Sequence, residues 1–371
     1  MLRSKNIHGI QMMKNKVTYA VLIAGILLLL VGCIKGAISG MNSVSFFLIA
    51  GFTLMAISFQ GFKTLKGFSF TLWILTAVTT SLYFPFLFLG VGDFSFRQLI
   101  IPLLQMIMFG VGSTMGLSDF VGVIKMPKGV LIGIACHFTI MPLVGYSLAK
   151  IFGFPPEIAA GLILVGSVPC GMASNVMSYL ANANVALSVT LTAVATLMAP
   201  LITPLLMQTL AGEYVNVEFL AMMWDITKIV IIPVAAGLVF NHFLSSRFSW
   251  LNKVMPILSM VSIAAIITVI TAAGHDSLLS VGWLLVLACF LHNSLGFLFG
   301  YGACKLLRMD ERSCRTIAIE VGLQNAGLAS GLALGMGKIA TVGLAPAIFG
   351  PLMNVTGSSL ATWWHNKPVK E

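Results

Sequence analysis

The stretch with the clearest chemistry is residues 319–330, which read I-E-V-G-L-Q-N-A-G-L-A-S. It places a carboxylate, Glu320, and two amides, Gln324 and Asn325, among apolar and small residues, and Glu320 is the only acidic residue deep inside an apolar segment. A charged side chain at the centre of a bilayer costs about 3 kcal/mol or more, so such a residue indicates a functional site. A helix that breaks beside it releases backbone carbonyls, and small hard cations bind carbonyl and carboxylate oxygens. The pattern predicts a cation site at Glu320.

A similar interruption occurs earlier in the chain. Pro169-Cys170-Gly171 stands inside an apolar segment, where proline removes a backbone donor and clashes with the preceding turn, and glycine relaxes the backbone. In the later stretch, Gly322 and Gly327 flank the two amides. We therefore predict two broken helices, with breaks at Pro169 and Gly171 and at Gly322 and Gly327.

Hard oxygen donors follow the first break. Ser174 and Asn175 come directly after it, and the next segment carries Ser188 and Thr192, whose i, i+4 spacing places them on one helical face. Together with Glu320 they are candidate ligands of one cation. The alternative is that the hydroxyls satisfy helix carbonyls and the amides hold helices together.

The composition is that of a polytopic membrane protein. Hydrophobic residues make up 58% of the 371 residues and charged residues 9%, with a mean hydropathy of +1.00, whereas soluble domains carry about 25% charged residues. Recurring apolar runs predict an all-α protein with twelve membrane spans. These are 17–34, 44–61, 69–90, 98–117, 129–152, 157–181, 185–211, 226–245, 254–273, 281–305, 313–336 and 340–364.

The distribution of basic residues predicts the orientation. With the N-terminus in the cytoplasm, sixteen of the 21 lysines and arginines fall in cytoplasmic segments. The outside segments hold Lys35, Arg97, Lys150, Lys228 and Lys338. The positive-inside rule then places both termini in the cytoplasm of a multi-pass protein of the inner or plasma membrane. The net charge of +10 is spread over many loops, which argues against nucleic acid as a partner.

An internal repeat relates the two breaks. At a constant offset of 155 residues, identical residues are paired as His137 with His292, Gly145 with Gly300, Tyr146 with Tyr301, and Lys150 with Lys305. At the same offset, Pro169-Cys170-Gly171 falls on Gln324-Asn325-Ala326. Each unit, 69–211 and 226–364, contains five spans, and an odd number inverts the second unit, as in secondary transporters. Spans 17–34 and 44–61 have no counterpart and form an N-terminal addition.

At these residues the chain resembles the bile acid:sodium symporter family. The matching blocks are G-x-x-P-x-G-x-A-S-N-V-M-x-Y-L at 166–180, N-V-A-L-S-V at 184–189 and E-V-G-x-Q-N at 320–325. The resemblance covers a transporter unit, residues 69–365, and leaves out residues 1–65. It implies a ten-helix core of two inverted repeats with two crossing broken helices. A panel domain would comprise helices in 69–117 and 226–273, and a core domain those in 129–211 and 281–364.

The resemblance also implies two sodium sites and a substrate site, with no cofactor beyond the coupling ion. The first sodium site would consist of Ser174, Asn175, Ser188, Thr192 and Glu320. The second would consist of Glu320, Gln324, the carbonyls of Val321 and Leu323, and His137, which replaces a family glutamine. The substrate, a small organic anion, would lie near Asn325 and Asn354, where this chain carries Met172 and Met353 at two positions that are often polar in the family.

We therefore expect a sodium-coupled symporter that imports an organic anion, bile-acid-like or a small apolar carboxylate, by alternating access. Because imidazole is a softer and more easily protonated ligand than an amide, the second sodium site could be weak, absent or modulated by protons. A proton-coupled organic anion transporter and a cation/proton antiporter of related fold are the alternatives. A membrane enzyme is not expected, since no metal-binding or nucleophile motif stands at helical spacing.

Overall fold

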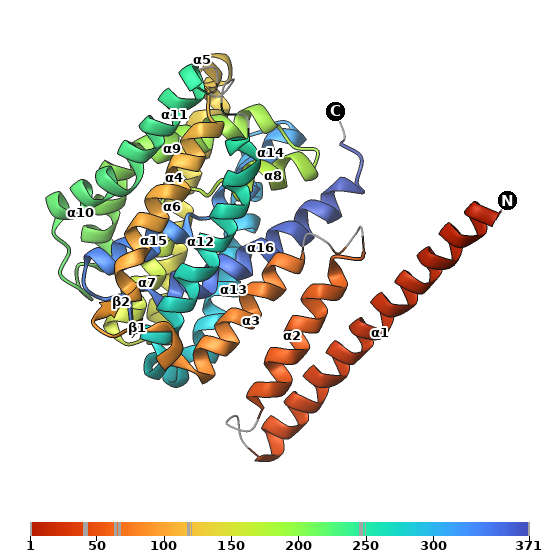
Figure 1. Cartoon of the computed structure of the whole chain (residues 1–371). Coiled ribbons are helices and arrows are strands. Elements are labelled where there is room, and N and C mark those ends of the chain that lie inside the picture. Colours follow the sequence, from red (N-terminus) through yellow and green to blue (C-terminus); the bar gives the residue numbers. More distant parts are fainter. Residues whose placement is uncertain are drawn as a thin grey trace.

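The computed structural model describes residues 2–39, 44–62, 65, 68–116, 119, 121–244, 248 and 250–369, and nearly all of them are helical (Figure 1). The first half of the chain forms α1 (Leu2–Ser39), α2 (Ser45–Phe59), α3 (Ser69–Tyr83), α4 (Ile100–Thr114), α5 (Gly122–Lys125), α6 (Pro127–Phe152), α7 (Pro156–Ser167) and α8 (Ala173–Leu180). The second half forms α9 (Val185–Leu206), α10 (Phe219–Ile226), α11 (Ile232–Leu244), α12 (Leu251–Ala273), α13 (His275–Leu306), α14 (Glu311–Gly322), α15 (Ala326–Gly335) and α16 (Leu344–His365).

Short elements complete the chain. Two π-helical segments, Met207–Ala211 and Thr227–Ile231, extend α9 and join α10 to α11. Two 3-10 turns, Pro85–Phe88 and Phe96–Leu99, flank the one departure from all-α structure among the described residues. This is a small antiparallel hairpin of β1 (Gly90–Val91) and β2 (Phe94–Ser95).

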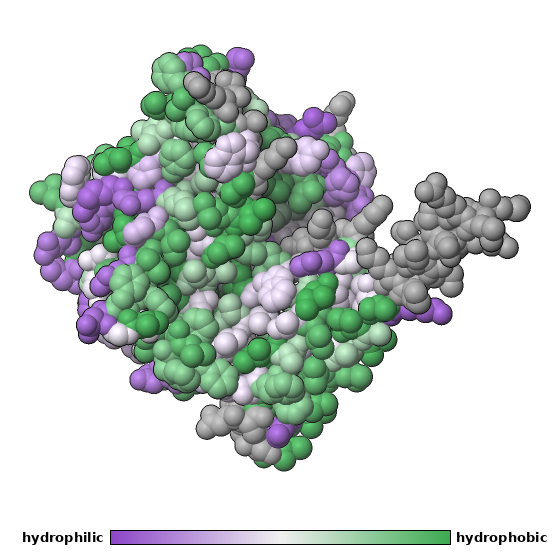
Figure 2. Space-filling view, viewed as in Figure 1, coloured by the Kyte–Doolittle hydropathy of each residue, from purple (hydrophilic) through white to green (hydrophobic). Residues whose placement is uncertain are grey.

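The apolar pattern indicates a multi-pass membrane protein. Within the described ranges, six helical runs are long and apolar enough to cross a membrane, and five shorter apolar helices accompany them. The six are Lys16–Gly36, Phe96–Thr114, Pro127–Phe152, Val185–Ala211, Phe219–Leu244 and His275–Leu306. Figure 2 shows apolar residues covering much of one face of the molecule, with hydrophilic residues mostly toward its edges. A surface of this kind suits lipid tails.

One predicted span begins earlier than expected. The helical run that was expected to begin at residue 226 begins at Phe219, about two turns before it. Lys228, which was counted with the outside segments although the predicted span 226–245 contains it, lies inside this run and pairs with Asp225 at 2.8 Å. Glu320 is thus not the only acidic residue within an apolar helix, but Asp225 has a basic partner one turn away.

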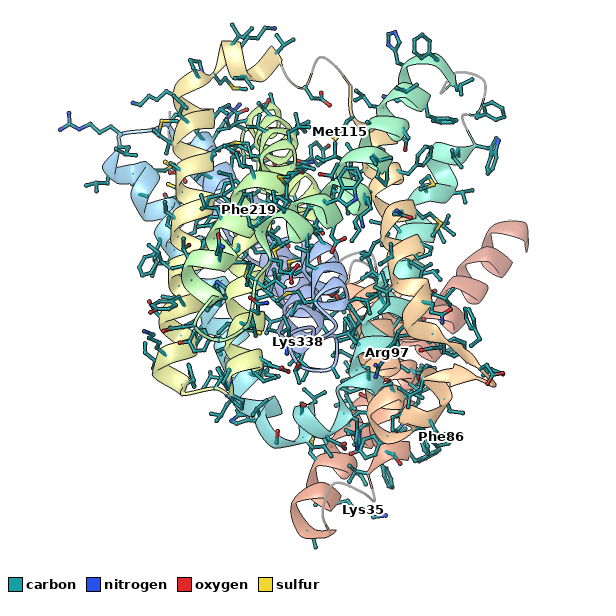
Figure 3. All side chains as sticks on the ribbon, turned by 90° about the vertical axis from the view of Figure 1, so that its left-hand side faces the viewer. Lys35, Phe86, Arg97, Met115, Phe219 and Lys338 are labelled. Atoms are coloured by element: carbon teal, nitrogen blue, oxygen red, sulfur yellow. The ribbon has the colours of Figure 1, made fainter. Side chains whose placement is uncertain are left out.

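The helices pack in two groups. In the first, α4 contacts α11 and α12, and α12 contacts α3. In the second, α6 and α13 contact each other, α6 packs on α7, and α13 packs on both α14 and α16. In the view of Figure 3, Lys35 and Phe86 lie toward one end of the molecule and Met115 toward the opposite end.

The N-terminal helices lie at one edge of the bundle, where α2 joins α1 to α3 (Figure 1). Gly25 of α1 and Gly51 of α2 bring the two backbones together, because an added Cβ on either would lie 3.1 Å from the other's carbonyl oxygen. Small residues allow this close approach between membrane helices. Lys63, Lys66, Arg247 and Lys370, which the predicted orientation counts as cytoplasmic, lie outside the described residues.

Candidate functional site

The two predicted breaks are present, and they lie side by side. Helix α7 ends at Ser167 and α8 begins at Ala173, while α14 ends at Gly322 and α15 begins at Ala326. Cys170 and Gln324 form an antiparallel bridge between the two extended segments. Pro169 and Gly171 lie within the first segment, and Gly322 borders the second. Gly327 falls outside it, as the second residue of α15.

Backbone hydrogen bonds join the two segments. The Asn325 N–H donates to the Pro169 carbonyl at 2.8 Å, and the Gly171 N–H donates to the Leu323 carbonyl at 3.1 Å. A Cβ at Gly171 would lie 2.9 Å from the Gln324 carbonyl oxygen, closer than real Cβ atoms come to backbone. Glycine is therefore required at this position for the two segments to meet.

The five residues predicted for the first cation site come together beside this junction. The carboxylate of Glu320 accepts hydrogen bonds from the Ser188 hydroxyl and, at 3.1 Å, from the Thr192 hydroxyl. The amide oxygen of Asn175 lies 2.9 Å from the Ser188 hydroxyl and 3.3 Å from that of Thr192. The Ser174 hydroxyl lies 3.3 Å from the Thr192 hydroxyl. The cluster thus draws oxygen atoms from α8, α9 and α14.

This cluster has the character of a cation site. Glu320 is 1% exposed, and Ser174, Ser188 and Thr192 are also buried. None of the ion pairs found in the described part of the chain involves Glu320. A buried carboxylate without a charged partner is costly, and hydroxyl and amide oxygens are ligands of hard cations.

The hydroxyl of Thr192 gives a prediction for this site. Thr192→Val keeps the shape of the side chain and removes one oxygen, so we expect sodium affinity to fall roughly tenfold, which corresponds to about 1.4 kcal/mol. The measurement is a sodium titration of the melting temperature of the purified protein. Thr190→Val is the matched control, since Thr190 is buried on the same helix but donates to the Ala186 and Asp119 carbonyls. Equal sodium affinity in both variants would exclude Thr192 as a ligand.

The residues predicted for the second sodium site also lie together. Backbone carbonyl oxygens at this site, however, are already in contact with side-chain nitrogen atoms of the protein. The two ring nitrogens of His137 lie 3.1 Å from the Glu320 carbonyl oxygen and 3.0 Å from that of Val168. The Gln324 amide nitrogen donates to the Val321 carbonyl at 2.6 Å. The amide oxygen of Gln324 is buried and has no hydrogen-bond partner.

A cavity of about 420 Å³ lies between the two helix groups. All four predicted substrate-site residues line it, namely Met172, Asn325, Met353 and Asn354. Its wall carries no charged side chain among the described residues. Ala173 and Ala326, the first residues of α8 and α15, also line the cavity, so the positive ends of two helices border it.

The opposite wall of this cavity comes from residues that the sequence did not single out. It includes Leu104 and Met108 of α4 and Met255, Ser259 and Ile266 of α12. Apolar side chains on an apolar helix carry no signal that separates a cavity wall from a lipid-facing surface. Only the packing of α4 and α12 across the broken helices identifies them.

Buried charged contacts hold the ends of the broken helices. Arg315, which the sequence placed in a cytoplasmic segment, is 2% exposed within α14. Its guanidinium binds the Glu311 carboxylate at 3.0 Å, the Ala181 carbonyl at 3.0 Å and the Trp364 carbonyl at 3.1 Å. The i, i+4 spacing of Glu311 and Arg315 was the available signal for this contact.

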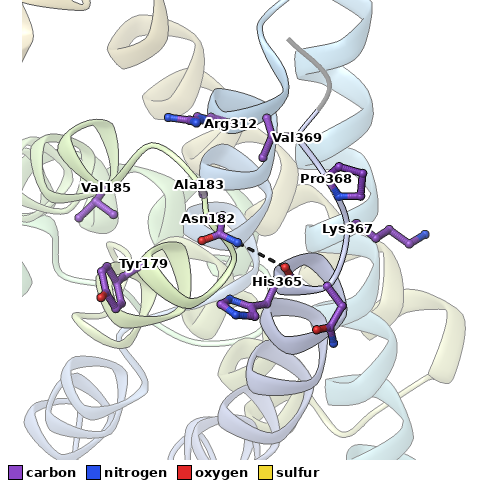
Figure 4. Close-up of a pocket in the computed structure, with 10 residues that line it drawn as sticks. Tyr179, Asn182, Ala183, Val185, Arg312, His365, Lys367, Pro368 and Val369 are labelled. Atoms are coloured by element: carbon purple, nitrogen blue, oxygen red, sulfur yellow. Dashed lines mark hydrogen bonds between the residues drawn. The ribbon is translucent and has the colours of Figure 1, made fainter.

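A second hollow, of about 530 Å³, lies at the end of α16 and apart from these residues. There the Asn182 amide donates to the His365 carbonyl at 3.3 Å (Figure 4). The side chains of Arg312 and Lys367, which also line the hollow, point in different directions in Figure 4. They do not converge on a common point, and none of the predicted site residues lies here.

The chain is similar to known transport proteins. Residues 101–281 match the model of the Sodium Bile acid symporter family. An uncharacterized sodium-dependent transporter of Bacillus subtilis is 39% identical over 82% of this chain and 93% of its own length. A probable chloroplastic sodium/metabolite cotransporter of Arabidopsis thaliana is 35% identical over 72% of this chain and 67% of its own length. The ileal sodium/bile acid cotransporter of Oryctolagus cuniculus is 31% identical over 62% of this chain and 67% of its own length.

Proposed function

Because this chain belongs to the sodium/bile acid symporter family, and is a membrane transporter and not an enzyme, we propose that it imports an organic monoanion together with sodium. The observation that carries the proposal is the oxygen cluster around Glu320. It combines a buried carboxylate that lacks a charged partner with three hydroxyls and one amide oxygen, next to the junction of the two broken helices. Sodium bound there neutralises the carboxylate and stabilises one arrangement of the two helix breaks.

The architecture of the transporter unit, 69–365, is part of this proposal. The packing of α3, α4, α11 and α12 with one another supports a panel domain of helices in 69–117 and 226–273. The packing of α6 to α9 and α13 to α16 supports a core domain. The two ends of the broken helices are tied in matching ways, which supports inverted repeats. Arg315 at the start of α14 binds the carbonyl of Ala181 after α8, and Glu157 at the start of α7 binds Lys338 after α15.

The substrate of this proposal is a monoanion with an apolar body. The cavity is lined mainly by apolar side chains, including Met108, Met172, Met255 and Met353, and by no cationic side chain. The positive ends of α8 and α15 attract the anionic group, and sodium at Glu320 removes the repulsion that the bare carboxylate would exert on it. Flexible methionine side chains adapt to the apolar remainder of the ligand.

The transport cycle follows from this placement. Sodium and the anion bind where the cavity separates the panel from the core. Sodium neutralises Glu320, and the positive ends of α8 and α15 face the charge of the anion. The core then moves against the panel and opens the cavity to the other side of the membrane. We place the protein in the inner or plasma membrane with both termini in the cytoplasm, which is what the distribution of basic residues favours.

Uptake into proteoliposomes tests the proposal. Labelled organic monoanions, from short branched 2-oxo acids to taurocholate, are presented under an inward sodium gradient or an equal potassium gradient. At least one should accumulate above equilibrium in sodium alone. Accumulation driven by a proton gradient and indifferent to sodium would contradict the proposal, and would favour the proton-coupled alternative, in which Glu320 is neutralised by a proton.

A further inference from the structure

The break between α14 and α15 exposes backbone carbonyls. Each of these carbonyls lies next to a nitrogen atom of the protein itself. The Val321 carbonyl accepts from the Gln324 amide at 2.6 Å, and the Gly322 carbonyl accepts from the Asn293 amide at 2.7 Å. The Leu323 carbonyl accepts from the Gly171 N–H at 3.1 Å. The Glu320 carbonyl lies 3.1 Å from a ring nitrogen of His137. Helix ends normally leave such groups for water, side chains or ligands.

The break in α7 shows the same pattern. The Ser167 carbonyl accepts from the Thr203 hydroxyl at 2.8 Å, and the Pro169 carbonyl accepts from the Asn325 N–H at 2.8 Å. The Val168 carbonyl lies 3.0 Å from the second ring nitrogen of His137. One imidazole therefore occupies the space between the carboxyl ends of α7 and α14, where the helix dipoles favour positive charge.

These donors are firmly held. Asn293 is fully buried, and its amide oxygen accepts from the Thr356 hydroxyl at 2.5 Å. His137 is 2% exposed and packs against the edge of Phe138 with ring centroids 4.9 Å apart. A cation that entered between the helix ends would have to displace the imidazole from one carbonyl and the Gln324 amide from another. Displacing buried donors without new partners costs about 1–3 kcal/mol for each group.

We propose that this chain binds a single sodium ion per transport cycle, because the imidazole of His137 fills the space between the helix ends and the Gln324 amide occupies the Val321 carbonyl, both of which a second ion would need. The inference rests on the proposed function, since it assigns the one ion to the Glu320 cluster. The oxygen of Gln324 that has no partner does not restore a second site. It is one oxygen on a residue that lines the cavity, whereas a hard cation needs several oxygens together.

The consequence is electrical. One sodium ion moving with one monoanion carries no net charge, so the membrane potential does not drive uptake, and the sodium concentration gradient supplies all of the coupling. His137 acts in this proposal as a positioning residue that fixes the two helix ends, and it does not have to bind sodium itself.

Equilibrium binding of labelled sodium to the purified full-length protein tests the proposal without a substrate. The wild type should bind about one ion per chain, and Glu320→Gln should bind none. His137→Gln should bind about two, because the shorter amide no longer spans both carbonyls and the second ion then has only the Gln324 amide to displace. His292→Gln is the matched control and should bind about one. His292 is the repeat partner of His137, but its ring contacts the Met141 carbonyl and neither helix break.

Each result has a defined meaning. Two ions bound by the wild type would overturn the proposal, and this reading does not depend on the folding of any variant. One ion bound by a folded His137→Gln variant would overturn the role given to His137. Absence of sodium binding in the wild type would contradict the proposed function itself, so the two failures are distinguishable.

Discussion

Sodium should raise the melting temperature of the wild-type protein above its value in potassium, and Glu320→Gln should abolish this difference. A ligand that binds only the folded state stabilises it by about 2.7 kcal/mol when its concentration is a hundred times its dissociation constant. The carboxylate is the only charged oxygen ligand in the cluster, and removing a charge from a buried pair costs about 2–5 kcal/mol. Sodium affinity should therefore fall by roughly thirtyfold or more.

The same variant should behave differently in potassium. Glutamine has nearly the shape of glutamate and carries no charge, so it relieves the cost of a buried carboxylate that lacks a cation. We therefore expect Glu320→Gln to be at least as stable as the wild type in potassium, although it no longer transports. Glu218→Gln, at an exposed carboxylate before α10, is the matched control and should keep the full response to sodium. A sodium response that survives in Glu320→Gln would place the ion elsewhere.

The sequence predicted the residues of the oxygen cluster because its chemistry is local. Pro169 and Gly171 interrupt one helix, Gln324 and Asn325 another, and each interruption stands next to the polar side chains concerned. The spacing of apolar residues and the positions of polar residues along the sequence indicate such features directly. The correspondence of the two breaks and the family resemblance supplied what local patterns lack, which is that Ser188, on the helix after the first break, would meet Glu320 across about 130 residues of chain.

Other features depend on tertiary contacts that no local pattern reports. Arg315 was counted with the cytoplasmic segments, yet its guanidinium is buried and binds carbonyls at the end of α8 and in α16. Lys228 was counted with the outside segments, yet it lies within a helical run that begins at Phe219, beside Asp225. Their pairing lowers the cost of keeping both within the helical run. The contacts of His137 with two carbonyls likewise follow only from the juxtaposition of α6 with both breaks.

Arg315→Leu should destabilise the folded protein by about 3–5 kcal/mol, the usual cost of removing one partner from a buried ion pair. Arg315 ties the first turn of α14 to the end of α8 through the Ala181 carbonyl, and to the end of α16 through the Trp364 carbonyl. Its loss also leaves the Glu311 carboxylate, which is 14% exposed, with Lys305 as its remaining basic partner. The measurement is the melting temperature in potassium, where sodium binding makes no contribution.

Arg312→Leu is the matched control for this variant. Arg312 lies one turn earlier on the same helix and lines the open hollow at the end of α16, so its loss should change stability by no more than about 0.5 kcal/mol. Lys fits less well than Arg at position 315, because its single ammonium cannot span a carboxylate and two separate carbonyls as the planar guanidinium does. Arg315→Lys should therefore recover only part of the loss. Equal stability of Arg315→Leu and Arg312→Leu would show that the ends of the broken helices are held by apolar packing alone.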